Sequence, residues 1–256
     1  RTHRSAKLTV KNDYIYTVSE ILTYNICPRQ YYFKYYLGLP EEIPKILPVG
    51  EDEDLLRRDE FGMPGHELGN IVHDILNKYD FCKGWHGQTC LSVPQTISES
   101  ASVLISGWIE SFSASKIGKR IRSSQMIESE LPFIFNYNGN LIKGRIDLVF
   151  GNGDYTILDY KSNNIGEKEI EAHVKHYELQ MQLYANALEA IYDYRPKEAI
   201  LYFLVPGIAV SVDISEGTMA KMQERLDTFL TTAERGEFPI IKGETCNWCA
   251  YKKFCC

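Results

Sequence analysis

The sequence lacks the features that mark membrane, secreted and fibrous proteins. No apolar run is long enough to cross a bilayer, no signal-peptide pattern stands at the start, and there is no internal repeat or low-complexity segment. A starting methionine is also missing, because the chain opens on Arg1, and this predicts a domain excised from a longer protein. The 256 residues are 44% hydrophobic and 24% charged, which is typical of a soluble globular protein with one large domain or two small ones.

Positive charge is not in excess either. The formal net charge is −6, which does not mark a nucleic-acid-binding protein, although a local basic strip can bind phosphates on an acidic protein. The densest such strip consists of Lys116, Lys119, Arg120 and Arg122. A solvated helix end explains this strip equally well, so charge alone leaves both interpretations open.

A disulfide framework is the third missing feature. The chain has seven cysteines, and an odd count without a secretion signal argues against paired cysteines. Cys246, Cys249 and Cys255 lie close together near the end of the sequence, and Cys27 is the remaining partner for a fourfold site. Such a site holds zinc or an iron–sulfur cluster; spacing alone cannot choose, although Cys-x2-Cys by itself favours zinc. Of the other three cysteines, Cys256 could substitute for Cys255. Cys82 and Cys90 are expected to be free thiols.

Capping residues and apolar spacing predict most of the helices. Thr17 and Glu20 form a capping box that begins the first helix, and Gly38 ends the second. The later helices follow from apolar residues at helical spacing, and residues 40–64 are predicted to form a surface loop. The predicted helices after the first cover 29–37, 66–79, 98–115, 169–192 and 215–236, and a predicted strand pair covers 199–205 and 208–212.

The stretch from Glu130 to Lys161 predicts three consecutive strands, around which the rest of the chain is organised. Asn138-Gly139 suits a tight hairpin, and Asn152-Gly153-Asp154 suits the second turn. Apolar and polar residues alternate in the first two strands, which is the period of a half-buried sheet. The alternation predicts a single core-facing set of seven residues: Leu131, Phe133, Phe135, Ile142, Ile146, Leu148 and Phe150.

The register of these strands follows from the length of the turns. If the turn at Asn138-Gly139 has two residues, Glu130 lies opposite Asp147. Asp159 and Lys161 are two residues apart on the third strand, so they share a face. They share it with Asp147 only if the second loop has an odd number of residues, or if a bulge intervenes.

This register gathers three carboxylates and a lysine on one patch of sheet. Carboxylates that lie so close repel each other unless a cation sits between them, and oxygen ligands suit magnesium or manganese. A lysine beside the metal can orient or help deprotonate an attacking water, and can neutralise charge on a phosphate. The alternative is an ordinary meander with charges on its wet face, but it leaves an acid in the middle of each strand unexplained.

Three motifs in this region resemble those of a known family. They are Gly-Arg-Ile-Asp at 144–147, Ile-Leu-Asp-Tyr-Lys at 157–161, and Gln180-x-x-x-Tyr184. Together they resemble the PD-(D/E)XK nuclease superfamily, specifically its RecB-like branch, which includes the nuclease domains of bacterial helicase–nucleases and the CRISPR-associated adaptation nucleases. The aromatic run after Cys27-Pro28 also resembles the opening of helicase-associated nuclease domains, so the resemblance extends from about Thr17 to the last cysteines.

The resemblance implies roles for individual residues. His73, Asp147 and Asp159 would hold magnesium or manganese, and Lys161 would be the catalytic lysine. Glu130, which the register alone brings to the site, is a further candidate ligand for metal or water. On spacing alone, a surface or edge position is the better interpretation of His73, and only the family pattern makes it a metal ligand.

The helix motif and the cysteines complete the implied site. Gln180 and Tyr184 are one helical turn apart and would lie beside the metal, although core packing alone would also explain Tyr184. The resemblance further favours a 4Fe–4S cluster over zinc as a staple between the two flanks of the nuclease core. Its ligands would be Cys27, Cys246, Cys249 and Cys255.

The implied fold is α/β, with a central mixed sheet flanked by helices in a single domain over residues 1–256. Within it, 66–213 would form the nuclease core, and 17–40 and 237–256 the cysteine-cluster flanks. The implied function is a metal-dependent DNA nuclease, either an exonuclease acting on DNA ends or single strands or an endonuclease. It would be the nuclease module of a helicase–nuclease in DNA repair and would work in the cytoplasm at the nucleoid. A catalytically silent DNA-end binder is the alternative, but such members typically lose a site residue, and this chain keeps them all.

Overall fold

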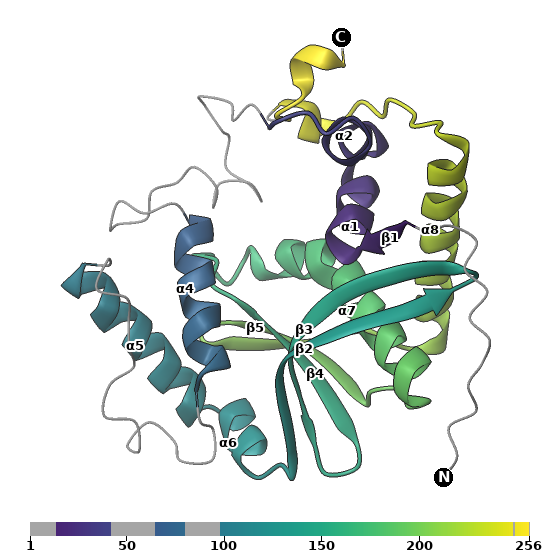
Figure 1. The fold of residues 1–256 in the computed structure, drawn as a ribbon. Coiled ribbons are helices and arrows are strands. Elements are labelled where there is room, and N and C mark those ends of the chain that lie inside the picture. The colour runs from purple at the N-terminus through teal and green to yellow at the C-terminus, as the bar shows by residue number, and fades with distance from the viewer. Residues whose placement is uncertain (1–13, 42–64, 80–97, 248, 256) are drawn as a thin grey trace.

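The structure is a computed structural model that describes residues 14–41, 65–79, 98–247 and 249–255. Its centre is a mixed six-stranded sheet in the order β1-β3-β4-β5-β6, with β2 also paired to β3 (Figure 1). The strands are β1 (Ile15–Thr17), β2 (Met126–Tyr137), β3 (Asn140–Gly151), β4 (Tyr155–Lys161), β5 (Glu198–Phe203) and β6 (Ile208–Val212). The predicted α/β class is confirmed. Three cysteines and most of the predicted loop at 40–64 lie outside the described residues, the cysteines being Cys82, Cys90 and Cys256.

The three consecutive strands form in the predicted register. Antiparallel pairing of β2 and β3 continues up to the two-residue turn Asn138-Gly139, and the pairs on either side of Glu130 place it opposite Asp147. Between β3 and β4 the loop is 152–154, which has the odd length required. The β3–β4 register, extended by one pair, sets Asp159 opposite Asp147.

Strand β3 changes its neighbour along its length. On the edge away from β2 its first half pairs in parallel with β1 at residues 141–143, and its second half pairs with β4 at residues 148–151. Among the described strands, none pairs with residues 144–147 on that edge. The topology therefore leaves a gap in the sheet at Asp147. The sequence did not predict β1, because three residues are too short to show a strand period.

Helices cover both faces of the sheet (Figure 1). One face packs on α1 (Val18–Ile26), α7 (Ile170–Tyr192) and α8 (Glu216–Arg235), and the other on α4 (Gly65–Asn77), α5 (Glu99–Ala114) and α6 (Lys116–Arg122). Successive residues of β5 alternate between the two layers, with Leu201 in the α7 layer and Tyr202 in the α4 layer. The central strands are consequently buried on both faces, as their apolar sequences require.

The prediction of one shared face for seven hairpin residues is wrong. The alternation reverses at Glu130 and Asp147, so residues nearer the hairpin tip pack in the α7 layer and residues beyond pack in the α4 layer. The first group is Leu131, Phe133, Phe135, Ile142 and Ile146, and the second is Leu148 and Phe150. Glu130 has a φ of 51°, a left-handed conformation that interrupts the pleat. A glutamate side chain gives no signal of that conformation.

Two predicted helices are divided in the structure. The aromatic segment predicted at 29–37 is α2 (Pro28–Tyr31) followed by a π-helix, η1 (Tyr32–Tyr36). The helix predicted at 98–115 ends at Ala114, because Ser115 leaves the helical conformation and caps α6 by accepting the Gly118 N–H. The other helices described begin or end within two residues of the predicted bounds.

The two ends of the described chain pack against each other. Phe238 lies against the rings of Tyr31 and Tyr32, and the Tyr251 hydroxyl donates to the Leu39 carbonyl at 3.0 Å. The aromatic run after Cys27 is therefore largely a packing surface between N-terminal and C-terminal segments. Among the described helices, none is both long and apolar enough to cross a bilayer.

Candidate active site

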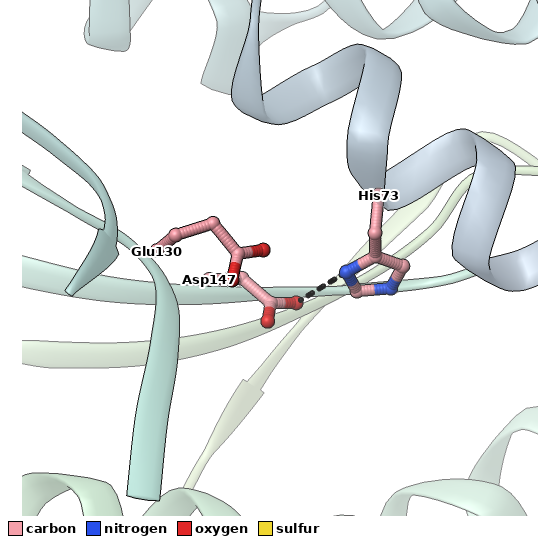
Figure 2. A group of neighbouring side chains, drawn as sticks. All are labelled: His73, Glu130 and Asp147. Atoms are coloured by element: carbon pink, nitrogen blue, oxygen red, sulfur yellow. Dashed lines mark ion pairs between the residues drawn. The ribbon is translucent and has the colours of Figure 1, made fainter. Parts of the chain in front are cut away.

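Asp147 occupies the gap in the sheet between β1 and β4. The backbone N–H of Tyr160 on β4 donates to its Oδ2 at 3.0 Å, so this carboxylate replaces a strand-to-strand bond. His73 on α4 approaches from the helical layer, and its Nδ1 lies 3.4 Å from the same oxygen (Figure 2). The Asp147 side chain is 13% exposed and that of His73 is 30% exposed, so the pair remains reachable from solvent.

Glu130 completes a group of three side chains that could hold a metal ion. One ligand atom each from His73, Glu130 and Asp147 lies within 4.8 Å of the other two, and Figure 2 shows them converging from α4, β2 and β3. Around octahedral magnesium, with ligands at about 2.1 Å, neighbouring ligand atoms lie about 3 Å apart and opposite ones about 4.2 Å apart. The spacing and the nitrogen and oxygen donors fit one divalent cation.

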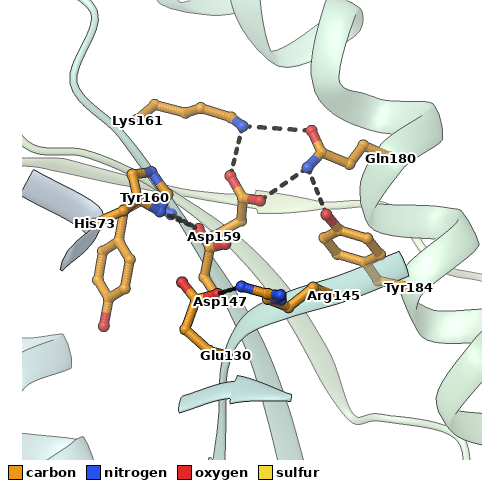
Figure 3. A network of polar contacts seen from close by, with 9 residues as sticks. All are labelled: His73, Glu130, Arg145, Asp147, Asp159, Tyr160, Lys161, Gln180 and Tyr184. Atoms are coloured by element: carbon orange, nitrogen blue, oxygen red, sulfur yellow. Dashed lines mark hydrogen bonds and ion pairs between the residues drawn. The ribbon is translucent and has the colours of Figure 1, made fainter. Parts of the chain in front are cut away.

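Beside this group, Asp159, Lys161 and Gln180 form a closed ring of polar contacts (Figure 3). Lys161 Nζ lies 2.7 Å from Asp159 Oδ2 and donates to Gln180 Oε1 at 3.3 Å, and Gln180 Nε2 donates to Asp159 Oδ1 at 3.0 Å. Gln180 also donates to the Tyr184 hydroxyl at 2.8 Å. The ring of Tyr177, one turn earlier on α7, has its centroid 4.1 Å from the ammonium. These contacts hold Lys161 as a cation in one place.

Burial and neighbouring charges shift the pKa values of Asp147, Lys161 and His73. Burial, and then the neighbouring charge of Asp159, raises the pKa of Asp147 well above its usual range. Burial alone would lower the pKa of Lys161, but Asp159 and other nearby negative groups outweigh it, so that pKa is raised. Burial lowers the pKa of His73, which leaves the imidazole neutral at pH 7 with a lone pair for a metal. A divalent cation would offset the repulsion between the two aspartates.

A sequence profile of the PD-(D/E)XK nuclease superfamily matches residues 16–256. The chain belongs to this superfamily. The match includes every residue of the candidate site, from α4 to α7, and the C-terminal cysteines. The predicted superfamily and fold are confirmed.

Named relatives of this chain are much longer proteins, and the similarity covers only part of each. The A subunit of the ATP-dependent helicase/nuclease from Syntrophomonas wolfei is 31% identical over 166 residues, which cover 57% of this chain and 13% of that protein. The protein of the same name from Clostridium acetobutylicum is 24% identical over 229 residues, or 71% of this chain and 18% of that protein. The chain therefore spans less than a fifth of these relatives.

A solved structure shares the fold at low sequence identity. A putative exonuclease from Eubacterium rectale has a TM-score of 0.55 and 12% identity, with 92% of this chain and 86% of that chain covered. The central mixed sheet between helices is thus an arrangement that this solved structure shares.

The structure brings the predicted site residues of this nuclease-superfamily chain together, with one difference in grouping. His73 and Asp147 lie in the three-residue group, and Glu130, the candidate from the hairpin register, is its third member. The carboxylate of Asp159 lies instead against Lys161 and Gln180. Its role as a metal ligand therefore stays a proposal.

Sequence reasoning misses two residues of the site. Tyr177 lies three positions before Gln180, so the helical period places both on one side of α7 and could have indicated it. Arg145 donates from Nη1 to Glu130 Oε2 at 3.0 Å. In the predicted hairpin register Arg145 lies diagonally opposite Glu130, and such diagonal pairs are within reach of long side chains, so the sequence could have indicated this contact.

The four cysteines predicted to form one site lie in the packed flanks. Cys27 joins α1 to α2, and the other three lie in or near the short helices η3 (Glu244–Asn247) and η4 (Lys252–Phe254). Burial raises the pKa of Cys249, with further contributions from the charges of the other three thiols, so all four are electrostatic neighbours. The set is Cys27, Cys246, Cys249 and Cys255, each half-buried.

The basic strip runs along the whole of α6, and two of its four residues make contacts within the protein. Arg120 pairs with Glu198, and Arg122 donates to the Ser113 carbonyl at 2.7 Å. Two of the four charges thus stabilise the corner between α5, α6 and the sheet. Neither a phosphate-binding strip nor a plain solvated helix end describes these residues fully.

Proposed function

We propose that this chain is the nuclease module of a helicase–nuclease and hydrolyses DNA phosphodiester bonds with magnesium or manganese. The observation that carries the proposal is the convergence of His73, Glu130 and Asp147 within 4.8 Å, beside the Asp159–Lys161 ion pair. Clustered acids and a fixed cation are what phosphoryl chemistry requires, since a metal and a positive side chain together stabilise the negative transition state.

The proposed metal ligands are His73, Glu130 and Asp147, with Asp159 as the further ligand expected from the family pattern. Asp159 lies near enough to Asp147 for its charge to raise that residue's pKa, which supports a shared cation. A divalent cation held by these residues would polarise the phosphate and favour loss of a proton from water. Attack of that water on phosphorus, in line with the 3′ oxygen, would break the bond between phosphorus and that oxygen. The proton of the attacking water would pass to solvent, and the 3′ oxygen would take up a proton from solvent.

The role of Lys161 follows from its surroundings. Its ammonium is paired with Asp159 and lies over the Tyr177 ring, and both contacts stabilise the charged form. We therefore assign Lys161 to phosphate-charge stabilisation and water orientation, and not to proton abstraction. Gln180 and Tyr184 hold Asp159 and Lys161 in place through the polar ring.

The proposed partner is a helicase, and the proposed substrate is a DNA end or single strand. Support comes from the name of the relatives, which are A subunits of an ATP-dependent helicase/nuclease and of which this chain matches 13% to 18%. A nuclease module joined to a translocating motor would act on the strands that the motor separates. Such a protein would work in the cytoplasm at the nucleoid.

We further propose a 4Fe–4S cluster at Cys27, Cys246, Cys249 and Cys255. The four thiols are electrostatic neighbours, and the segments that carry them pack against each other, which is consistent with a structural staple. A fourfold thiolate site suits zinc or an iron–sulfur cluster, and the family resemblance favours the cluster.

The alternative function is a catalytically silent DNA-end binder with the same fold. Such a protein would not need the paired acids, whose negative charges repel each other, or the buried lysine, whose desolvation lowers stability. All the predicted site residues are present, and they lie in two neighbouring groups, one of His73, Glu130 and Asp147 and one around Lys161. The enzymatic proposal is therefore the better supported one.

The deciding experiment uses end-labelled single-stranded and duplex DNA with manganese, magnesium or a chelator. We expect metal-dependent cleavage by the wild type, and a loss of about a thousandfold or more in Asp159→Ala and in Lys161→Ala. DNA binding should survive both substitutions, as fluorescence anisotropy can measure. Cleavage by either purified variant at the wild-type rate would end the proposal.

A further inference from the structure

Arg145 stands at the mouth of the candidate active site with most of its hydrogen-bonding capacity free. Its side chain is 65% exposed, and in the described part of the chain its one side-chain hydrogen bond runs from Nη1 to Glu130 Oε2 at 3.0 Å. Figure 3 shows the guanidinium next to Glu130 and Asp147. A guanidinium has five N–H donors, so a single contact leaves several of them directed to solvent.

Glu130 is held in an unusual conformation at the same place. Its φ of 51° is rare for a residue with a large side chain, and backbone strain of this kind is concentrated at functional sites. Its carboxylate has two possible partners: it pairs with Arg145, and it also lies within 4.8 Å of the ligand atoms of His73 and Asp147, where a metal could bind. A divalent cation bound there would compete with Arg145 for the Glu130 carboxylate.

We propose that Arg145 is a phosphate-binding residue, paired with Glu130 in the free protein and available to a backbone phosphate when Glu130 turns to the metal. The planar fork of a guanidinium matches two oxygens of a phosphate, which a point charge such as lysine cannot do. Arg145 contacts Glu130, which is itself a member of the proposed metal group. The phosphate bound by Arg145 would therefore be the scissile phosphate or the one next to it. The inference rests on the proposed nuclease function and names a substrate contact for it.

The salt dependence of DNA binding tests this assignment. In a Lys161→Ala background with manganese, binding of a labelled single-stranded oligonucleotide is measured across a range of sodium chloride concentrations. Removing one phosphate contact reduces the slope of log affinity against log salt by about 0.7 for single strands. We expect that reduction, with affinity about fivefold weaker, in Arg145→Ala. Arg145→Lys should restore the slope because it keeps the charge.

Arg120 provides a matched control. It is also an exposed arginine paired with a glutamate, Glu198, but it lies beside Thr156 at the opposite end of β4 from Lys161. Arg120→Ala should leave the slope unchanged. Equal slopes for Arg145→Ala and its parent, or no binding of the oligonucleotide at the lowest salt, would overturn the proposal.

The pairing with Glu130 supplies a second test. In binding assays without a divalent metal, Glu130→Gln should tighten DNA binding more when Arg145 is present than in Arg145→Ala, since only the former releases a guanidinium. An equal gain in both backgrounds would mean a general charge effect and would overturn the pairing argument. Manganese affinity, measured by calorimetry without DNA, should be unchanged or tighter in Arg145→Ala; its loss would show that Arg145 only maintains the metal group.

These outcomes separate the inference from the proposed function. Cleavage by the wild type together with an unchanged slope in Arg145→Ala would reject the phosphate site and retain the nuclease. A reduced slope in Arg145→Ala, with no cleavage by the wild type in any metal, would retain the phosphate site and reject the nuclease.

Discussion

Lys161 is the residue whose chemistry the site controls most closely. Its ammonium is enclosed by a carboxylate, an amide oxygen and an aromatic face, and its side chain is only 14% exposed. A cation in that position cannot swing away to solvent. In the proposed reaction, Lys161 would supply positive charge at a fixed point, which is more effective than a mobile lysine because no reorganisation is needed.

Substitution of Tyr177 tests whether its ring holds this cation. Tyr177→Leu should slow metal-dependent cleavage by about 2- to 30-fold, because a cation–π contact contributes roughly 0.5 to 2 kcal/mol. Tyr177→Phe keeps the ring and should stay near the wild-type rate, although the hydroxyl contact with Asn163 at 3.4 Å is lost. Single-turnover cleavage measures the effect. Equal rates for the Leu and Phe variants would show that the ring does not position Lys161.

Backbone strain at Glu130 predicts an unusual order of stabilities. A left-handed conformation costs an L-residue about 1–2 kcal/mol, and glycine is free of that cost. Both Glu130→Gly and Glu130→Ala lose the carboxylate and the Arg145 pair, so they differ mainly in backbone freedom. We expect Glu130→Gly to be more stable than Glu130→Ala by about 1 kcal/mol in urea unfolding with a chelator present. The reverse order would contradict the left-handed backbone at this position.

At the scale of elements, β3 is the strand that organises the site. It pairs with β2 along its whole length, and with β1 and β4 in succession on its other edge. The change of neighbour opens the gap at Asp147, and the reversal of the pleat sends the two halves of the hairpin to different helical layers. The two features occur at the same point, so the strand builds the site without an inserted loop.

Gly144, the first residue of the Gly-Arg-Ile-Asp motif, is explained by packing on β3. A Cβ atom there would lie 2.4 Å from Phe133 Cζ and 2.9 Å from Val18 Cγ2. Gly144→Ala should therefore lower the free energy of unfolding by about 1–3 kcal/mol. Gly107 in α5 is the control, because nothing lies within 4 Å of the place that an added methyl group would take and alanine favours a helix.

Thermal or urea unfolding of the two variants measures the contrast. Gly107→Ala should be neutral or stabilising by up to about 1 kcal/mol. A Gly144→Ala protein as stable as the wild type would mean that Phe133 and Val18 move aside without loss, and the close approach on β3 would then not explain this glycine.

At the scale of the whole molecule, the N-terminal and C-terminal segments of the described chain pack against each other. Segments more than two hundred residues apart in sequence meet through the contacts of Phe238 with Tyr31 and of Tyr251 with Leu39. A cluster held by cysteines from both segments would close nearly the entire chain into a loop. By analogy with a disulfide, that constraint is worth up to about 5 kcal/mol.

Cys27→Ala tests the proposed cluster. Wild-type protein purified without oxygen should be brown and contain about four irons per chain, the usual content of a cubane cluster. Cys27→Ala should lose the iron and become poorly soluble or readily proteolysed, whereas Cys90→Ala, outside the predicted ligand set, should retain both iron and solubility. Colourless protein with one zinc per chain would replace iron–sulfur by zinc. Full iron content in Cys27→Ala would exclude Cys27 as a ligand.

The local parts of this protein were predictable from its sequence alone. Asn138-Gly139 specifies a two-residue turn, and the period of two then sets the pairing of Glu130 with Asp147. Thr17 and Gly236 mark helix ends by their capping chemistry, and both positions are confirmed. These features depend on neighbours a few residues away, so the sequence by itself determined them.

The tertiary structure decided how these local parts meet. His73 reaches Asp147 because α4 packs on one face of the sheet, and helical spacing alone had placed this histidine at a surface or an edge. The left-handed Glu130 and the pairing of β1 with β3 likewise have no local signal. Each depends on contacts between segments distant in sequence, whose energies compete with local preferences, so only the folded chain shows which preference is overridden.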